Sequence, residues 1–154
     1  MCGRAVNKND ALILVWFESL LVTRGDYFFV SEIEMAGNVE QSLQELMNVD
    51  GAIGCCIADY TSGMSLGTAG TTVDLELAAA GITQVVKAKM RTMKELGISG
   101  EIDDILITLQ DQFHVIRPTA KHKGLFIYLV LDKARANLAL ARRKVTDVEA
   151  GIEI

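Results

Sequence analysis

A glycine-rich stretch, GTAGTT from Gly67 to Thr72, precedes the longest predicted helix of the chain. A loop that holds a triphosphate has the form GxxxxGK[ST], because its lysine contacts the phosphates, and a dinucleotide-binding loop has the form GxGxxG. GTAGTT lacks the lysine and does not fit the second glycine spacing either. The sequence therefore predicts no nucleotide site at this position.

The histidines and acidic residues do not form a recognisable metal-binding or catalytic set. His114 falls in a predicted strand and His122 in a predicted loop, without HExxH spacing or a partner cysteine pair. We expect both imidazoles to be solvated. Asp103-Asp104 and Asp59 lie beside predicted turns, where acidic side chains usually cap the backbone or add surface charge. The sequence thus predicts no metal, no cofactor and no catalytic carboxylate pair.

Two adjacent cysteines, Cys55 and Cys56, lie in the apolar segment GAIGCCIAD. Successive side chains of a strand point to opposite sides of the sheet, and three cysteines do not make a disulfide framework. We interpret both as small buried hydrophobes rather than nucleophiles. This use of cysteine favours a reducing, cytoplasmic location.

The element that must organise the rest is a helix predicted from about residue 73 to residue 96, with Thr71 or Thr72 as its N-cap. One apolar stripe recurs at spacings of three and four residues: Leu75, Ala79, Ile82, Val86, Met90 and Met93. A second, with many small residues, lies on an adjoining face: Leu77, Ala78, Gly81, Val85, Ala88 and Leu96. The surplus predicts either a homodimer or a central helix in a thick single core.

The remaining elements are shorter. A helix is predicted at 38–47 with Asn38 as its cap, and hairpins are predicted from 51–59 with 64–69 and from 103–109 with 112–117. The runs at 51–59 and 125–131 lack polar alternation, which is typical of central strands. A last helix, capped by Asp132, has the apolar stripe Ala134, Leu138, Ala141, Val145 and Val148. The element order is α-β-β-α-β-β-β-α, an α/β (α+β) fold.

Composition and charge exclude some partner classes. The net charge of −5 argues against nucleic acid or an anionic membrane recognised through a broad basic surface. The apolar run from Ala11 to Phe17 is too short to span a bilayer and lacks the features of a secretion signal. We expect an N-terminal extension at 1–34, as an extra amphipathic helix or strand, and one domain at 35–154.

Three segments in this order carry a family resemblance: ELMNVDGAIGCCIADYTSGMSLGTAG, DDILITLQDQFHVIRP and LFIYLVLDKARANLALARRKV. Together with the long helix they cover about residues 38–149 and resemble the Roadblock/dynein light chain family, in particular its short bacterial members. The resemblance implies a five-stranded antiparallel sheet between helices, a profilin-like fold. It also implies homodimers formed through the long helix and the third strand.

The function implied by the resemblance is that of a non-enzymatic module that regulates or scaffolds a Ras-like small GTPase. No catalytic residue is carried over. The expected dimer interface comprises Leu75, Ala78, Ala79, Ile82, Val85, Val86, Ile105 and Ile107. A basic face of the last helix, formed by Arg142, Arg143 and Lys144, is either a partner contact or a solvated surface.

Two other functions remain open. The first is a small-molecule or redox sensor, since Cys55 and Cys56 are at hand and folds of this kind can house ligands. A core that reads as filled with Leu, Ile and Val argues against it. The second is a structural adaptor without a GTPase partner.

Overall fold

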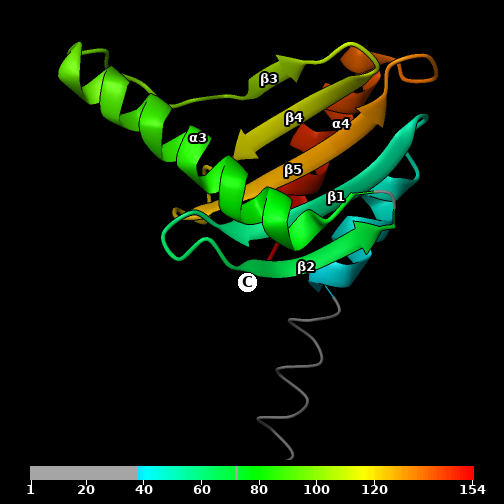
Figure 1. Cartoon of the computed structure of the whole chain (residues 1–154). Coiled ribbons are helices and arrows are strands. Elements are labelled where there is room, and N and C mark those ends of the chain that lie inside the picture. Colours follow the sequence, from blue (N-terminus) through cyan, green and yellow to red (C-terminus); the bar gives the residue numbers. More distant parts are fainter. Residues whose placement is uncertain (1–37, 72) are drawn as a thin grey trace, which may run out of the picture. The chain divides into compact units, whose positions relative to one another are not determined.

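The apolar run predicted to be central forms β5 (Leu125–Asp132), the middle strand of a five-stranded antiparallel sheet in the order β2-β1-β5-β4-β3 (Figure 1). The computed structural model describes residues 38–71 and 73–154, so the predictions for 1–34 lie outside its described part. The other strands are β1 (Ala52–Asp59), β2 (Ser65–Gly70), β3 (Ile105–Thr108) and β4 (Gln112–Pro118). This arrangement confirms the predicted fold class.

One face of the sheet, here called the two-helix face, is covered by a helical segment at 38–47 and by α4 (Leu138–Gly151). Leu43 and Leu46 from the first helix and Val145 from α4 are buried against the sheet. The helix at 38–47 lies so close to β2 that a Cβ atom on Gly67 would be 2.9 Å from Leu43 Cδ1. Glycine at this position therefore permits the tight contact between helix and sheet.

The opposite face, here called the α3 face, is covered by α3 (Leu75–Glu95), which packs chiefly over β1 and β2. Figure 1 shows the last turns of α3 extending beyond the strands. Asp74 is the N-cap and its side chain accepts from the Leu77 N–H, so the prediction of Thr71 or Thr72 was wrong. Gly97 follows the C-cap with φ +65°, a conformation that glycine adopts without strain.

The last helix begins later than predicted. Its N-cap is Asn137, whose side chain accepts from the Leu140 N–H. Asp132 ends β5 instead, and its carboxylate accepts from the Ala134 N–H in a turn. Ala134, predicted as part of the apolar stripe, therefore lies before α4 and not on it. Among the described residues, no helix is both long and apolar enough to cross a membrane.

At the start of the described chain, Asn38 is already helical rather than a cap. Its side-chain oxygen accepts from the Glu153 N–H at 3.3 Å, which joins the first helix to the segment after α4. The beginning and the end of residues 38–154 thus meet at one end of the two-helix face.

Candidate interaction surfaces

Most of the residues that could be chemically reactive are buried or bound by hydrogen bonds and ion pairs within the chain. Cys55 and Cys56 are fully buried, one on each face of the sheet. Burial raises the pKa of both thiols to about 12, so neither is a ready nucleophile at neutral pH. Gly67 and Gly70 belong to the edge strand β2 rather than to a loop, so GTAGTT does not form a phosphate-binding loop.

The prediction that both histidines are solvated was wrong. His114 Nδ1 is 2.8 Å from the Tyr128 hydroxyl, and its Nε2 is 3.0 Å from the Gln112 side-chain oxygen. Burial lowers the pKa of His114. His122 Nε2 lies 2.9 Å from the backbone oxygen of Ile152, which ties its loop to the end of α4. Within residues 38–71 and 73–154, no cluster of three or more His, Cys, Asp or Glu residues could hold a metal ion.

The acidic side chains stabilise turns and ion pairs. Asp59 accepts hydrogen bonds from the hydroxyls of Thr61 and Ser62 and from the Thr61 N–H. These bonds lower the pKa of Asp59 to about 2. Asp104 binds the Arg142 guanidinium, so Asp59 and Asp104 have different partners and do not form a carboxylate pair.

The predicted dimer interface divides into two groups. Leu75, Ala79, Ile82 and Val86 are buried against the chain's own sheet, and none of them is more than 9% exposed. The remaining residues are accessible: Ala78, Ile105 and Ile107 are half-buried and Val85 is 36% exposed.

Other apolar residues on or just after α3 are more exposed than the predicted ones. Leu77 is 71% exposed, Leu96 67% and Ile98 50%. Leu77 and Leu96 belong to the second apolar stripe of the sequence, and that stripe was the pattern that could have predicted their exposure. β3, the strand at the edge of the sheet, pairs with β4 on one side. The α3 face thus combines exposed apolar side chains with a short edge strand.

A groove of about 480 Å³ lies between the second half of α3, the segment 98–103 and the end of β4. Its apolar lining includes Met90, Met93 and Ile98, and its cationic lining includes Arg117 and Lys123. Sequence reasoning missed this groove, because it is formed by a loop and by a part of α3 that contributes no buried residue to the core.

The basic face of α4 is partly engaged within the chain. Arg142 binds Asp104 through two hydrogen bonds, with Nε 2.7 Å from Oδ2 and Nη2 2.9 Å from Oδ1. Lys144 Nζ is 2.7 Å from Glu45 Oε2. Arg143 is exposed. Each of the three predicted partner-contact residues is accessible in part, although two of them already bind carboxylates.

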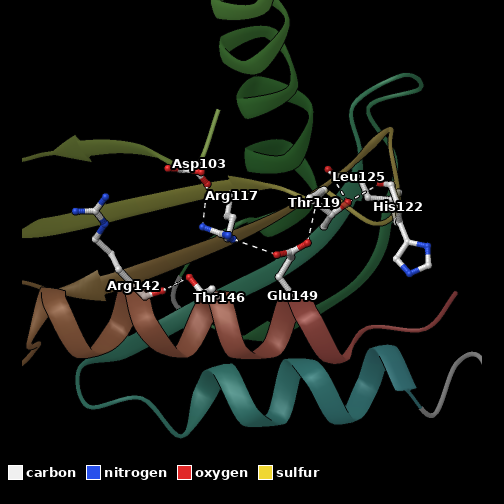
Figure 2. Close-up of polar contacts among 9 residues, drawn as sticks. Asp103, Arg117, Thr119, His122, Leu125, Arg142, Thr146 and Glu149 are labelled. Carbon is white, nitrogen blue, oxygen red and sulfur yellow. Dashed lines mark hydrogen bonds and ion pairs between the residues drawn. The ribbon is translucent and has the colours of Figure 1, made fainter. Parts of the chain in front are cut away.

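Glu149, only 7% exposed, connects α4 with two other elements. Its Oε2 is 3.4 Å from Arg117 Nε on β4, and its Oε1 accepts from the Ala120 N–H at 3.0 Å. Arg117 also donates through Nη1 to the backbone oxygen of Asp103 at 3.1 Å. Figure 2 shows these contacts joining α4, β4 and the segment that leads into β3.

Similarity to known proteins lies in the fold. No family model matches the sequence and no curated protein does. Myxococcus xanthus MglB superposes with a TM-score of 0.68 at 15% identity, over 76% of this chain and 86% of that chain. The gliding protein MglB from Thermus thermophilus gives 0.67 at 15% over 77% and 87%, and a Roadblock/LC7 domain from Streptomyces avermitilis gives 0.62 at 10% over 75% and 91%. The chain has the Roadblock/LC7 fold.

In this Roadblock/LC7 fold the accessible features lie on both faces and at one edge. The α3 face offers exposed apolar residues, β3 offers a short edge, and the two-helix face offers the basic residues of α4. A further MglB structure of similar likeness, with a TM-score of 0.67 at 15% identity, has a tetrameric arrangement of that protein.

Proposed function

We propose that the protein is a non-enzymatic, homodimeric interaction module that regulates or scaffolds a Ras-like small GTPase. The observation that carries this proposal is the Roadblock/LC7 fold with its exposed apolar α3 residues. The buried thiols and the hydrogen-bonded histidines and carboxylates support a role in binding rather than catalysis. The domain proposed for this role is 35–154, and no cofactor is needed for it.

Self-association is proposed to use α3 and the edge strand β3. Edge strands leave backbone N–H and C=O groups unpaired, and the segment ILIT of β3 carries neither a charge nor a proline to discourage pairing. Two copies related by a two-fold axis would continue the sheet and bring their α3 helices together. In this arrangement Ala78, Val85, Ile105 and Ile107 contact the second copy, together with Leu77. The buried residues of the predicted set, Leu75, Ala79, Ile82 and Val86, pack α3 against the sheet.

The proposed dimer is tested by placing a charge at an exposed apolar residue. Leu77→Glu would put two like charges near the two-fold axis, and we expect it to yield a folded monomer by light scattering at micromolar concentration. Leu140→Glu is the matched control, because Leu140 is also exposed, at 63%, but lies on α4. A monomeric wild type, or a Leu77→Glu protein that dimerises as well as the control, would contradict the proposal.

The GTPase partner is proposed from the family resemblance and from the basic face of α4. Arg143 is exposed, and Arg142 and Lys144 keep 47% and 37% of their side-chain surface accessible, so acidic residues of a partner can reach all three. The experiment measures nucleotide exchange and hydrolysis by the Ras-like GTPases encoded in the same genome. We expect the protein to change the rate of nucleotide exchange or of hydrolysis for at least one of these GTPases. Arg143→Glu should reduce that change. No binding and no effect on any of them would favour the structural adaptor.

The groove gives the sensor alternative one specific observation. Its volume of about 480 Å³ falls in the range of small-molecule sites. Native mass spectrometry of the purified protein tests this alternative, with Met93→Trp as the variant that fills the groove. A bound molecule that disappears in the variant would support a sensor, and identical unliganded masses would remove that support. The inert thiols give the redox version no comparable support.

A further inference from the structure

Two ion pairs on α4 connect the helix to different elements. Arg142 binds Asp104, which lies immediately before β3, with nitrogen to oxygen distances of 2.7 and 2.9 Å. Lys144 binds Glu45 of the neighbouring helix at 2.7 Å. The first pair therefore links α4 to the edge of the sheet, whereas the second stays within the helical layer.

The segment before β3 is held from the two-helix face by two arginines. Arg142 binds the side chain of Asp104. Arg117 donates to the backbone oxygen of Asp103 at 3.1 Å (Figure 2). The Asp104 side chain is only 12% exposed, although the Arg142 side chain is 47% exposed. A two-point guanidinium contact to a largely covered carboxylate fixes both the position and the direction of the chain.

β3 itself is bound to the rest of the sheet by only a short ladder. It has four residues, and its ladder runs from Ile105, opposite Ile116, to Thr108, opposite Phe113. A short edge strand frays easily, and an unfixed segment must lose backbone freedom before it can pair with another strand. Contacts that fix the start of β3 thus lower the cost of edge pairing.

We propose that Arg142 is a positioning residue for self-association: through Asp104 it holds the start of β3 in the conformation that pairs with a second copy. The helix α4, which lies on the sheet face opposite α3, thereby sets part of the strength of the dimer. This inference rests on the proposed dimerisation through β3.

Its test compares Arg142→Gln with Lys144→Gln, which breaks a similar ion pair on the same helix. Sedimentation equilibrium of Arg142→Gln should show a dimer dissociation constant raised roughly tenfold, because the contact is lost in both copies. Hydrogen exchange of the amides from Ile105 to Thr108 should also become faster. Lys144→Gln should leave both quantities as in the wild type. The charge-swapped double variant, Asp104→Arg with Arg142→Asp, should restore both to the wild-type values.

The outcomes separate this inference from the proposed dimer. A dimeric wild type whose dissociation constant and β3 exchange are unchanged in Arg142→Gln would overturn the positioning role and leave the dimer standing. Equal losses in Arg142→Gln and Lys144→Gln, with equal drops in melting temperature, would overturn it as well, because they indicate general destabilisation. A monomeric wild type would overturn the dimer itself, and the inference with it.

Discussion

The two faces of the sheet are covered to different degrees. On the two-helix face, the segment 38–47 and α4 bury a continuous set of aliphatic side chains and are tied by polar contacts such as Lys144 to Glu45 and Glu149 to Arg117. On the α3 face a single helix covers the sheet, and the buried residues of this helix end at Val86, just past its middle. Its second half lines a groove and leads to exposed Leu96 and Ile98.

This difference indicates a division of labour within one small domain. The core residues and the ion pairs of the two-helix face are satisfied within the chain, while Leu140 and the basic residues of α4 stay accessible. The α3 face leaves apolar surface and a sheet edge accessible, which is where a second copy would add burial. Substitutions on each face test this difference through the free energy of unfolding and the dimer dissociation constant.

The largest effect is expected from a charge in the buried part of the α3 face. Ala79 is fully buried between α3 and the sheet, so Ala79→Glu would place an unpaired carboxylate in the core. We expect destabilisation of more than about 3 kcal/mol and loss of the native circular dichroism signal. Ala80→Glu, at the exposed neighbouring position of α3, should fold normally. A folded, monomeric Ala79→Glu protein would restore Ala79 to the dimer interface.

A large but smaller effect is expected from truncating a side chain on the two-helix face. Leu46 is fully buried, and Leu46→Ala should lower the free energy of unfolding by about 2–5 kcal/mol in urea denaturation. The dimer dissociation constant of the folded protein should not change. Leu77→Ala should have the opposite effects. Its free energy of unfolding should stay within about 0.5 kcal/mol of the wild-type value, whereas its dimer dissociation constant should rise. Equal effects of both variants on both quantities would remove the distinction between the faces.

A moderate pH dependence is expected on the α3 face from His114. Burial lowers the pKa of this imidazole below its ordinary value of 6.5, so the unfolded chain takes up a proton more readily than the folded one. Stability should therefore fall as the pH drops below about 6.5, until the folded state is protonated too. His114→Gln should flatten this part of the profile of melting temperature against pH. An unchanged profile would show that other groups cause it.

The smallest effect is expected at the turn between β1 and β2. Hydrogen bonds from Thr61 and Ser62 lower the pKa of Asp59 from 3.8 to about 2, so the charged form stabilises the fold above pH 4. This contribution should disappear as the pH falls from about 4 to about 2. Asp59→Asn should lower the melting temperature slightly at neutral pH and match the wild type near pH 2. A constant difference across this range would assign the effect to packing.

The strands and the long helix were predictable because their signals are local. The unbroken apolar run of β5 and the hairpin before Pro118 need no knowledge of distant residues. Helix starts were less certain, because several residues in a row can accept a backbone N–H. Asp132 does so in a turn and Asn137 does so at the true start of α4, and spacing alone did not separate them.

The candidate surfaces were predictable only in part. Periodicity grouped Leu75, Ala79, Ile82 and Val86 correctly as one stripe, but it does not say whether the chain's own sheet or a second copy covers that stripe. The ion pairs Arg142 to Asp104 and Lys144 to Glu45 join residues 38 and 99 positions apart. Contacts at such separations depend on the tertiary fold, so no spacing rule shows them.

Cys55 and Cys56 are neighbours in the chain but lie in different cores, the first on the two-helix face and the second on the α3 face. A thiol reagent added to the native protein reaches either sulfur only when the layer above it opens. Variants that keep one of these cysteines and lack both the other and Cys2 would therefore report on one layer each. Their labelling rates would measure separately how often α3 moves off the sheet and how often the helix pair does, with native cysteines as the reporting groups.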